Sequence, residues 1–274
     1  KLADDGATLK DLSSDAETGE KVVSMFEIED RMPFGNLLFF TKKGMIKKTD
    51  WNEYEQRKDC FQAVKLNEAI VFPLPDEGRR LSVMAISEIL ERLPAMDAVL
   101  VGPGLGQSEG TMAILTAVME QFQGPVVVDA DGINLLSRHK AILRRRNSPT
   151  VLTPHEGEFL RLDPDYHGDR LSSAVRFSRE HGCITVLKGH DTLITDGTVC
   201  YRNTTGNPGM AVGGSGDVLA GIIVSLLGQG LHPLQASAVG VWLHGAAGDR
   251  SAQRIGQYGM LPTDLLEDLP RLMK

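Results

Sequence analysis

Four short apolar runs, each ending in glycine or in polar residues, constrain the fold of this chain more than any other feature. They are AVLVGPG, PVVVDADG, TVLTPHE and ITVLKGHD, in that order, and helical periods lie between them. Strands that are apolar throughout, with polar residues only at their carboxyl ends, are typical of a parallel sheet covered on both faces. The sequence therefore predicts an α/β fold, with a mostly parallel sheet and helices on both faces.

The stretch SEGTMAILTAVMEQF illustrates the predicted helices. Ser108 is the expected N-cap, because its hydroxyl can accept a hydrogen bond from the first turn. The residues that fall on one apolar face are Leu115, Val118, Met119 and Phe122. We interpret this helix as one that packs on the core.

The first quarter of the chain has a different pattern. KVVSMFEI, NLLFFTKKGMIKKTDWNEY and CFQAVKL are short runs rich in β-branched and aromatic residues, separated by turn-forming stretches. They predict a β-meander. We therefore divide the chain into a short β-rich segment, residues 1–66, and an α/β domain, residues 67–274.

Charge and cysteine content narrow the function classes. The net charge of -7 and the isoelectric point near 5.5 argue against broad binding to nucleic acid or an anionic membrane. No apolar run reaches the roughly 18 residues of a membrane span, and the first residues lack the apolar core of a signal peptide. Cys60, Cys183 and Cys200 lie far apart and form no CxxC pair. We expect reduced thiols, a cytoplasmic protein and small-molecule ligands.

The stretch GGSGD, residues 213–217, precedes the apolar helical run VLAGIIVSLLGQG. Glycines let several N–H groups converge, and the unpaired N–H groups and dipole of a helix start favour an anion at the same point. This predicts a site for a phosphate group. Asp217 has two interpretations: it caps the helix, or it takes a proton from a substrate hydroxyl that attacks the phosphate.

Six motifs in order resemble the ADP/ATP-dependent NAD(P)H-hydrate dehydratases of the ribokinase-like superfamily: EAIVFPLP, VGPGLG, VVVDADGINLL, LTPHEGEFLRL, VLKGHDTLITDG and NPGMAVGGSGDVLAGI. The resemblance implies a ribokinase-like fold and a lyase of metabolite repair. Such an enzyme uses ADP or ATP to phosphorylate the ring hydroxyl of hydrated NADH or NADPH, and loss of phosphate restores the nicotinamide. Mg²⁺ would accompany the nucleotide, held by phosphates and water, so no metal-binding side chains are assigned.

The same resemblance implies roles for individual residues. Asp217 would be the catalytic base, with Gly214 and Gly216 forming the anion hole. The substrate would contact Gly104, Gly106 and His155, together with Asp217. The nucleotide would contact Lys188, Gly189, His190, Asp191, Thr192 and Gly216.

Each of these residues also has a possible structural role. The pattern of residues 188–192 is also typical of the turn of a β-hairpin, and such a turn can still bind the nucleotide. His155 could be only a satisfied polar group, and Glu158 could cap the helix EFLRL. Asp129 and Asp131 are expected to organise the cleft, with a metal role left open.

Two further stretches are given structural roles. RRRN, residues 144–147, is expected to be a solvated helix end that compensates the dipole. Trp242 and His244 are expected to pack within a helical segment rich in small residues.

The amino-terminal part departs from the dehydratase pattern. Residues from about 20 to 66 resemble one blade of the C-terminal β-pinwheel domain of DNA gyrase or topoisomerase IV, without its wrapping box. The family's usual first strands and helices have no counterpart, so the sheet should expose an edge and favour a homo-oligomer. Alternatives to the dehydratase are a ribokinase-like kinase of a vitamin precursor or sugar, an inactive nucleotide-binding relative, and a DNA-binding fragment led by KKGMIKK.

Overall fold

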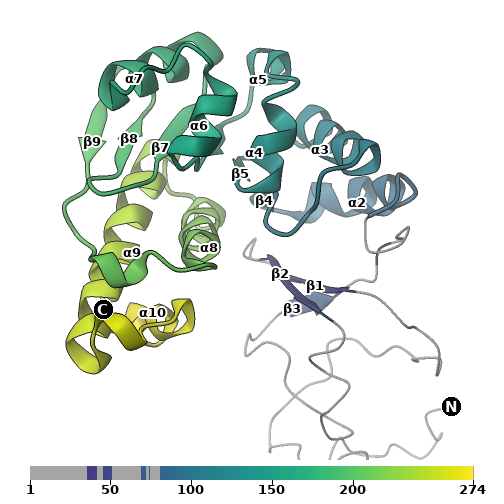
Figure 1. The fold of residues 1–274 in the computed structure, drawn as a ribbon. Coiled ribbons are helices and arrows are strands. Elements are labelled where there is room, and N and C mark those ends of the chain that lie inside the picture. Colours follow the sequence, from purple (N-terminus) through teal and green to yellow (C-terminus); the bar gives the residue numbers. More distant parts are fainter. Residues whose placement is uncertain (1–35, 42–45, 51–68, 72–73, 75–80, 274) are drawn as a thin grey trace, which may run out of the picture.

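A six-stranded sheet forms the centre of the α/β part in the computed structural model, which describes residues 36–41, 46–50, 69–71, 74 and 81–273. The strand order is β4-β5-β6-β7-β8-β9, with parallel pairing from β4 to β7 and antiparallel pairing from β7 to β9 (Figure 1). This confirms the mostly parallel sheet. The strands are β4 (Val99–Val101), β5 (Val126–Val128), β6 (Thr150–Leu152), β7 (Ile184–Leu187), β8 (Leu193–Thr195) and β9 (Cys200–Arg202).

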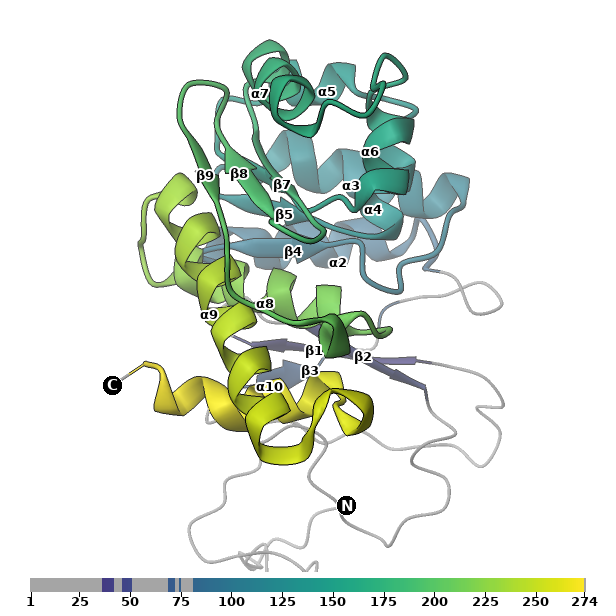
Figure 2. The ribbon, with the colours of Figure 1, turned by 60° about the vertical axis from the view of Figure 1, so that its left-hand side comes forward.

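Helices cover both faces of this sheet, as Figure 2 shows. Because successive side chains of a strand point to opposite faces, neighbouring residues of one strand enter different cores. Val127 packs with α8 and α9, whereas Val126 and Val128 pack with residues of α3, α4 and α6. The helices are α2 (Ala85–Arg92), α3 (Glu109–Gln121), α4 (Asp131–Leu136), α5 (Ala141–Arg145), α6 (Glu156–Leu162), α7 (Arg170–His181), α8 (Ser215–Gly228), α9 (Pro233–Ile255) and α10 (Pro262–Asp268). Short 3-10 turns are η2 (Leu93–Ala95), η3 (Pro208–Met210), η4 (Gln257–Gly259) and η5 (Leu269–Arg271).

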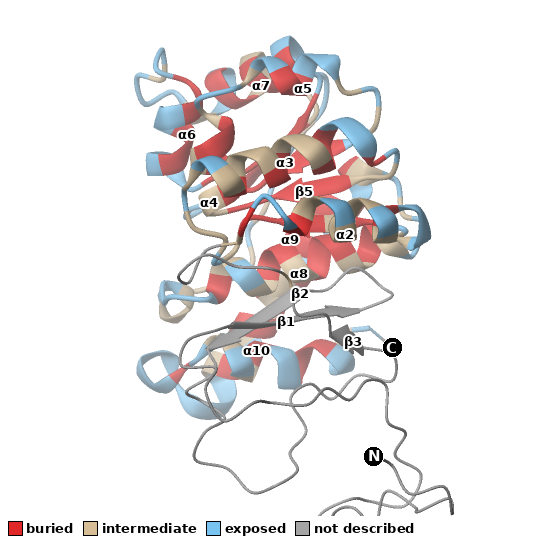
Figure 3. Ribbon diagram, turned by 90° about the vertical axis from the view of Figure 1, so that its right-hand side faces the viewer, coloured by how far each residue is buried: buried red, intermediate tan, exposed pale blue. Residues whose placement is uncertain are grey.

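Helix α3 follows its sequence signals closely. The Ser108 hydroxyl accepts from the N–H of Thr111 at 3.1 Å, and the Thr111 hydroxyl accepts from the N–H of Ser108 at 2.8 Å. This reciprocal capping satisfies two N–H groups at the helix start. The predicted apolar face of the helix is buried, as Figure 3 shows for the inner side of α3.

Two structural expectations are wrong in part. Arg144 and Arg145 are exposed in the last turn of α5, as expected of a helix end. Arg146 is not solvated in this way: its guanidinium donates to the carbonyls of Met119 and Phe122, each at 2.7 Å, and to that of Gly124. It thereby satisfies carbonyls at the end of α3, and burial lowers the pKa of Arg146 to about 10. Trp242 is not packed inside, since 48% of it is exposed on α9.

The amino-terminal strands form a separate sheet of order β2-β1-β3, made by β1 (Asn36–Thr41), β2 (Ile46–Asp50) and β3 (Ala69–Val71). The pairing of β1 with β2 is antiparallel, as expected for neighbouring strands of the predicted β-meander. Strand β3 comes from the EAIVFPLP motif and pairs with β1. The runs KVVSMFEI and CFQAVKL lie outside the described residues.

Strand β4 ends the larger sheet, with β5 as its single strand neighbour among the residues described. The strands β1, β2 and β3 do not extend that sheet. None of the helices in the described ranges is long and apolar enough to span a membrane.

Gly102, at the end of β4, is the position where a side chain is least tolerable. Its φ is +130°, and a Cβ there would lie 1.8 Å from the carbonyl oxygen of Asp129. We expect Gly102→Ala to lower the free energy of unfolding by about 3 kcal/mol or more, measured by urea denaturation. Gly168→Ala is the matched control, since φ is +96° with open space around it, and it should cost roughly 1–2 kcal/mol. Equal losses in the two variants would contradict this account.

Candidate active site

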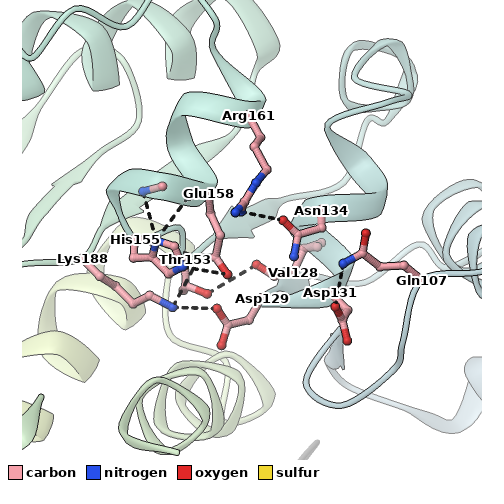
Figure 4. A network of polar contacts seen from close by, with 11 residues as sticks. Gln107, Val128, Asp129, Asp131, Asn134, Thr153, His155, Glu158, Arg161 and Lys188 are labelled. Atoms are coloured by element: carbon pink, nitrogen blue, oxygen red, sulfur yellow. Dashed lines mark hydrogen bonds and ion pairs between the residues drawn. The ribbon is translucent and has the colours of Figure 1, made fainter. Parts of the chain in front are cut away.

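The carboxyl ends of β5, β6 and β7 bring the predicted polar residues together at one edge of the sheet (Figure 4). Asp129 follows β5 and is buried, and Lys188 follows β7. Lys188 Nζ lies 2.8 Å from Asp129 Oδ1 and 3.9 Å from Glu158 Oε2. The ammonium group is thus held between two carboxylates at the strand ends.

The glycine-rich start of α8 lies beside this ammonium group. Gly214 is the N-cap, with φ +90°, a conformation that favours glycine. A Cβ at Gly216 would lie 3.2 Å from Lys188 Nζ and 3.9 Å from Asp129 Oδ2. The N–H groups at the start of α8 and a fixed positive charge therefore meet at one point, which suits an anionic group.

Asp217 occupies the first turn of α8, while Gly214 holds the capping position. The side chain of Asp217 reaches solvent, yet the surrounding protein withdraws enough water from it to raise the pKa of its carboxyl group. The negative charge of Asp129 raises this pKa further, and Lys188 opposes the shift. A carboxylate with a raised pKa is a stronger proton acceptor than an ordinary aspartate, which suits a base.

His155 is the N-cap of α6 and belongs to a capping box with Glu158. Its Nδ1 accepts from the N–H groups of Gly157 at 3.0 Å and Glu158 at 3.2 Å. Glu158 Oε2 accepts from the N–H of His155 at 2.8 Å, so the capping role predicted for Glu158 is confirmed. Because Nδ1 accepts these two bonds, Nε2 is the ring nitrogen left to donate. It lies 3.6 Å from Oε1 of Glu158, and 56% of the side chain is exposed. His155 can therefore donate a hydrogen bond to a ligand.

The VGPGLG loop is held by Asp131. The N–H of Gly106 donates to Asp131 Oδ2 at 2.9 Å, and Gln107 Nε2 donates to Asp131 Oδ1 at 3.1 Å. Gly104 and Gly106 both have positive φ, at 64° and 75°. Asp131 thus organises this loop beside the buried Asp129, as expected, and a metal role for either is not needed to explain the contacts.

Residues 188–192 form the turn of an antiparallel hairpin, in which Leu187 pairs with Leu193. The Thr192 hydroxyl donates to the carbonyl of Gly189 at 3.0 Å, and Asp191, with φ +58°, forms an ion pair with Arg202. The predicted hairpin is confirmed. The turn leaves 95% of the His190 side chain exposed.

Two residues of α9 that sequence reasoning did not assign to the site support its loops. His244 Nε2 lies 3.2 Å from the hydroxyl of Ser215, the first residue of α8. Asp249 accepts from the N–H of Gly206 at 2.9 Å and from Asn207 Nδ2 at 3.0 Å. His244 therefore ties the start of α8 to α9, and Asp249 ties the residues before η3 to α9. The signal for them in the sequence was two polar residues in the small-residue helix VWLHGAAGD.

Burial of His244 predicts a specific pH dependence of stability. Burial lowers the pKa of His244 from 6.5 to about 4, so the ring is neutral in the folded state at pH 5 and protonated in the unfolded chain. A histidine with a lowered pKa stabilises the fold less as pH falls below 6.5. We expect about 2 kcal/mol to be lost through this group between pH 7 and pH 5.

The measurement is urea unfolding of the wild type and of His244→Gln at both pH values. The variant removes the titrating group, and other titrations cancel in the comparison. Between pH 7 and pH 5, the free energy of unfolding of the wild type should fall by about 2 kcal/mol more than that of the variant. Equal losses would contradict a buried, neutral His244.

The fold and this site define a ribokinase-like α/β protein. A ribokinase-like superfamily protein from Enterococcus faecalis superimposes with a TM-score of 0.63 at 33% identity, over 71% of this chain and 69% of that chain. An ADP/ATP-dependent NAD(P)H-hydrate dehydratase from Bacillus subtilis, co-crystallised with ATP/Mg²⁺ and soaked with CoA, gives 0.58 at 28% identity, over 70% and 78%.

The chain belongs to the NAD(P)H-hydrate dehydratase family, whose model matches residues 56–271. The bifunctional NAD(P)H-hydrate repair enzyme Nnr of Moorella thermoacetica is 43% identical over 219 residues, 77% of this chain and 41% of that protein. The Escherichia coli enzyme of the same name is 42% identical over 195 residues, 69% and 37%. The chain thus spans about two fifths of the length of these relatives. The family match begins upstream of the domain boundary predicted at residue 67.

Proposed function

We propose that this chain is a lyase that dehydrates hydrated NADH and NADPH at the expense of ADP or ATP. The observation that carries the proposal is the meeting of Lys188, the start of α8 and Asp217 at one point. Phosphoryl transfer needs an anion-stabilising environment beside a base that accepts the proton of the attacking hydroxyl. This site supplies both.

The proposed roles follow the geometry. Asp217 removes the proton of the substrate ring hydroxyl as that oxygen attacks the terminal phosphorus of the nucleotide. The bond from this phosphorus to its bridging oxygen breaks, and AMP leaves when the donor is ADP, or ADP when the donor is ATP. Gly214 and Gly216 hold the transferred phosphoryl group through their N–H groups, and Lys188 neutralises its charge. Phosphate then leaves with the C–O bond, a proton leaves the adjacent ring carbon, and the nicotinamide double bond is restored.

The two ligands would occupy opposite flanks of this centre. Residues 188–192 and Gly216 are proposed to hold the nucleotide, while Gly104, Gly106 and His155 hold the hydrated nicotinamide nucleotide. The site fits the phosphates, because its fixed positive groups surround one point. Mg²⁺ would be held chiefly by phosphates and water. Within the described part, no group of three or more His, Cys, Asp or Glu side chains is placed to bind a metal ion.

The decisive test is incubation of the pure chain with hydrated NADH, Mg²⁺ and either ADP or ATP while the absorbance of NADH is followed. Absorbance should appear only when both nucleotide and protein are present, and the better of the two nucleotides settles the preference. A chain that consumes nucleotide with a small alcohol but leaves the hydrate unchanged would be a kinase and would contradict the proposal.

We also propose a homo-oligomer that acts in the cytoplasm, with residues 1–66 as a separate β-rich segment. Strand β4 offers a free edge within the described sheet, and such edges are commonly covered. Cys183 and Cys200 are both unpaired, in keeping with a reducing compartment. Light scattering on the purified chain tests the oligomer, and a monomer would contradict it.

A further inference from the structure

Arg170, the first residue of α7, binds three carbonyl oxygens of one chain segment. Its Nη1 donates to the carbonyl of His190 at 2.8 Å. Its Nη2 donates to those of Leu187 at 3.1 Å and Lys188 at 3.2 Å. All three carbonyls lie at or in the turn that joins β7 to β8. No role was predicted for Arg170 from the sequence.

We infer that Arg170 is a positioning residue that sets the backbone of this turn for nucleotide binding. The inference rests on the proposed function and concerns the same site. A guanidinium group is a planar, rigid fork of donors, so three simultaneous bonds fix the orientation of the peptide groups that it contacts. Lysine, with one compact ammonium group, cannot reproduce that geometry.

Peptide geometry connects these bonds with ligand binding. In a planar trans peptide the carbonyl of one residue and the N–H of the next point in opposite directions. Fixing the carbonyls of Lys188 and His190 toward Arg170 therefore directs the N–H groups of Gly189 and Asp191 away from it. The pattern holds at Leu187, where the next N–H, that of Lys188, donates to the carbonyl of Pro154 at 2.8 Å.

Gly189 gives Arg170 the room that this arrangement needs. A Cβ at Gly189, whose φ is +150°, would lie 2.9 Å from Nη2 of Arg170. The turn and the guanidinium group are thus in close contact, with no side chain between them.

The other side of Arg170 contacts α6. Its Nε lies 3.2 Å from Oε1 of Glu156, the residue after His155. Glu156 is more than half exposed, so this ion pair is worth little by itself. The contact shows that Arg170 lies between the start of α6 and the turn that joins β7 to β8.

The test compares Arg170→Met with Arg176→Met. Arg176 lies on the same helix, and its Nη2 is 2.6 Å from Oδ2 of Asp163, a partner outside the turn. The first measurement is hydrogen exchange of peptides covering residues 187–193, without ligand. Exchange should be faster in Arg170→Met and unchanged in Arg176→Met.

The second measurement is calorimetry with ADP and Mg²⁺. The Kd should rise on the order of 10-fold in Arg170→Met, take an intermediate value in Arg170→Lys, and stay within about twofold in Arg176→Met. In the dehydration assay, KM for the nucleotide should rise while KM for the hydrate does not. Loss of stability alone would not produce this difference between the two substrates.

The outcomes separate this inference from the proposed function. Unchanged exchange and unchanged ADP affinity in Arg170→Met overturn the inference. ADP binding that depends on Arg170, without any dehydration by the wild type, supports the inference and contradicts the proposed function. A wild-type chain that binds neither ADP nor ATP contradicts both.

Discussion

Replacing Asp217 with asparagine is expected to lower nucleotide-dependent turnover by on the order of 10³-fold, because the amide cannot accept the proton of the attacking hydroxyl. Asparagine is close in size to aspartate, so the phosphate-binding N–H groups of α8 stay in place. Nucleotide affinity should therefore stay within a fewfold of the wild type. Turnover of the hydrate and calorimetry with ADP measure the two quantities separately. An active preparation whose Asp217→Asn or Asp217→Ala variant is equally active would end the assignment of Asp217 as the base.

The raised pKa of Asp217 adds a stability prediction of definite sign. A carboxyl group whose folded pKa is raised favours the folded state when protonated, and that contribution disappears as pH rises through the folded pKa. At pH 8 the carboxylate is therefore less favourable in the folded protein than in the unfolded chain. Removing the charge should leave Tm at pH 8 no lower than in the wild type.

Asp196 is the matched control, because its pKa is shifted in the opposite direction. The N–H groups of Val199 and Thr198 donate to its Oδ1, each at 2.8 Å, and these bonds lower its pKa. Its carboxylate therefore stabilises the fold at neutral pH. Asp196→Asn should lower Tm slightly and keep the turnover of the wild type. A lower Tm in Asp217→Asn than in Asp196→Asn would contradict the assigned signs.

The sequence located the strands well because their apolar runs are short and bounded by polar residues. The four runs AVLVGPG, PVVVDADG, TVLTPHE and ITVLKGHD contain β4, β5, β6 and β7, in that order. The carboxyl ends of parallel strands lie at the same edge of a sheet. The residues that follow these strands in the sequence therefore include much of the candidate site. Local capping also followed from short-range rules, as at Ser108 and Glu158.

Contacts between distant segments were not predictable in the same way. Lys188 and Asp129 are 59 residues apart and meet because β5 and β7 flank β6. The bond of His244 to Ser215 depends on how α9 is rotated against α8, and apolar periodicity does not specify that rotation. For the same reason the outward direction of Trp242 was missed.

Substitutions in the ion pair of Lys188 and Asp129 should have the largest combined effect on the free energy of unfolding and on nucleotide affinity. Lys188→Met removes the cation beside Gly216, so nucleotide affinity and turnover should each fall by on the order of 10²-fold. It also leaves the carboxylate of Asp129 buried without its partner, which should lower the free energy of unfolding by about 3 kcal/mol. Urea unfolding and calorimetry with ADP and Mg²⁺ measure the two losses.

The double variant Asp129→Asn with Lys188→Met separates these two losses. Asparagine carries no charge, so the unpaired buried carboxylate is gone and most of the stability should return. Nucleotide affinity should not return, because the positive charge at the start of α8 is still absent. Recovery of stability alone assigns the ammonium group of Lys188 to the phosphates. Recovery of both stability and nucleotide affinity would instead show that the ion pair only stabilises the fold. The anion site would then depend on the N–H groups of α8 alone.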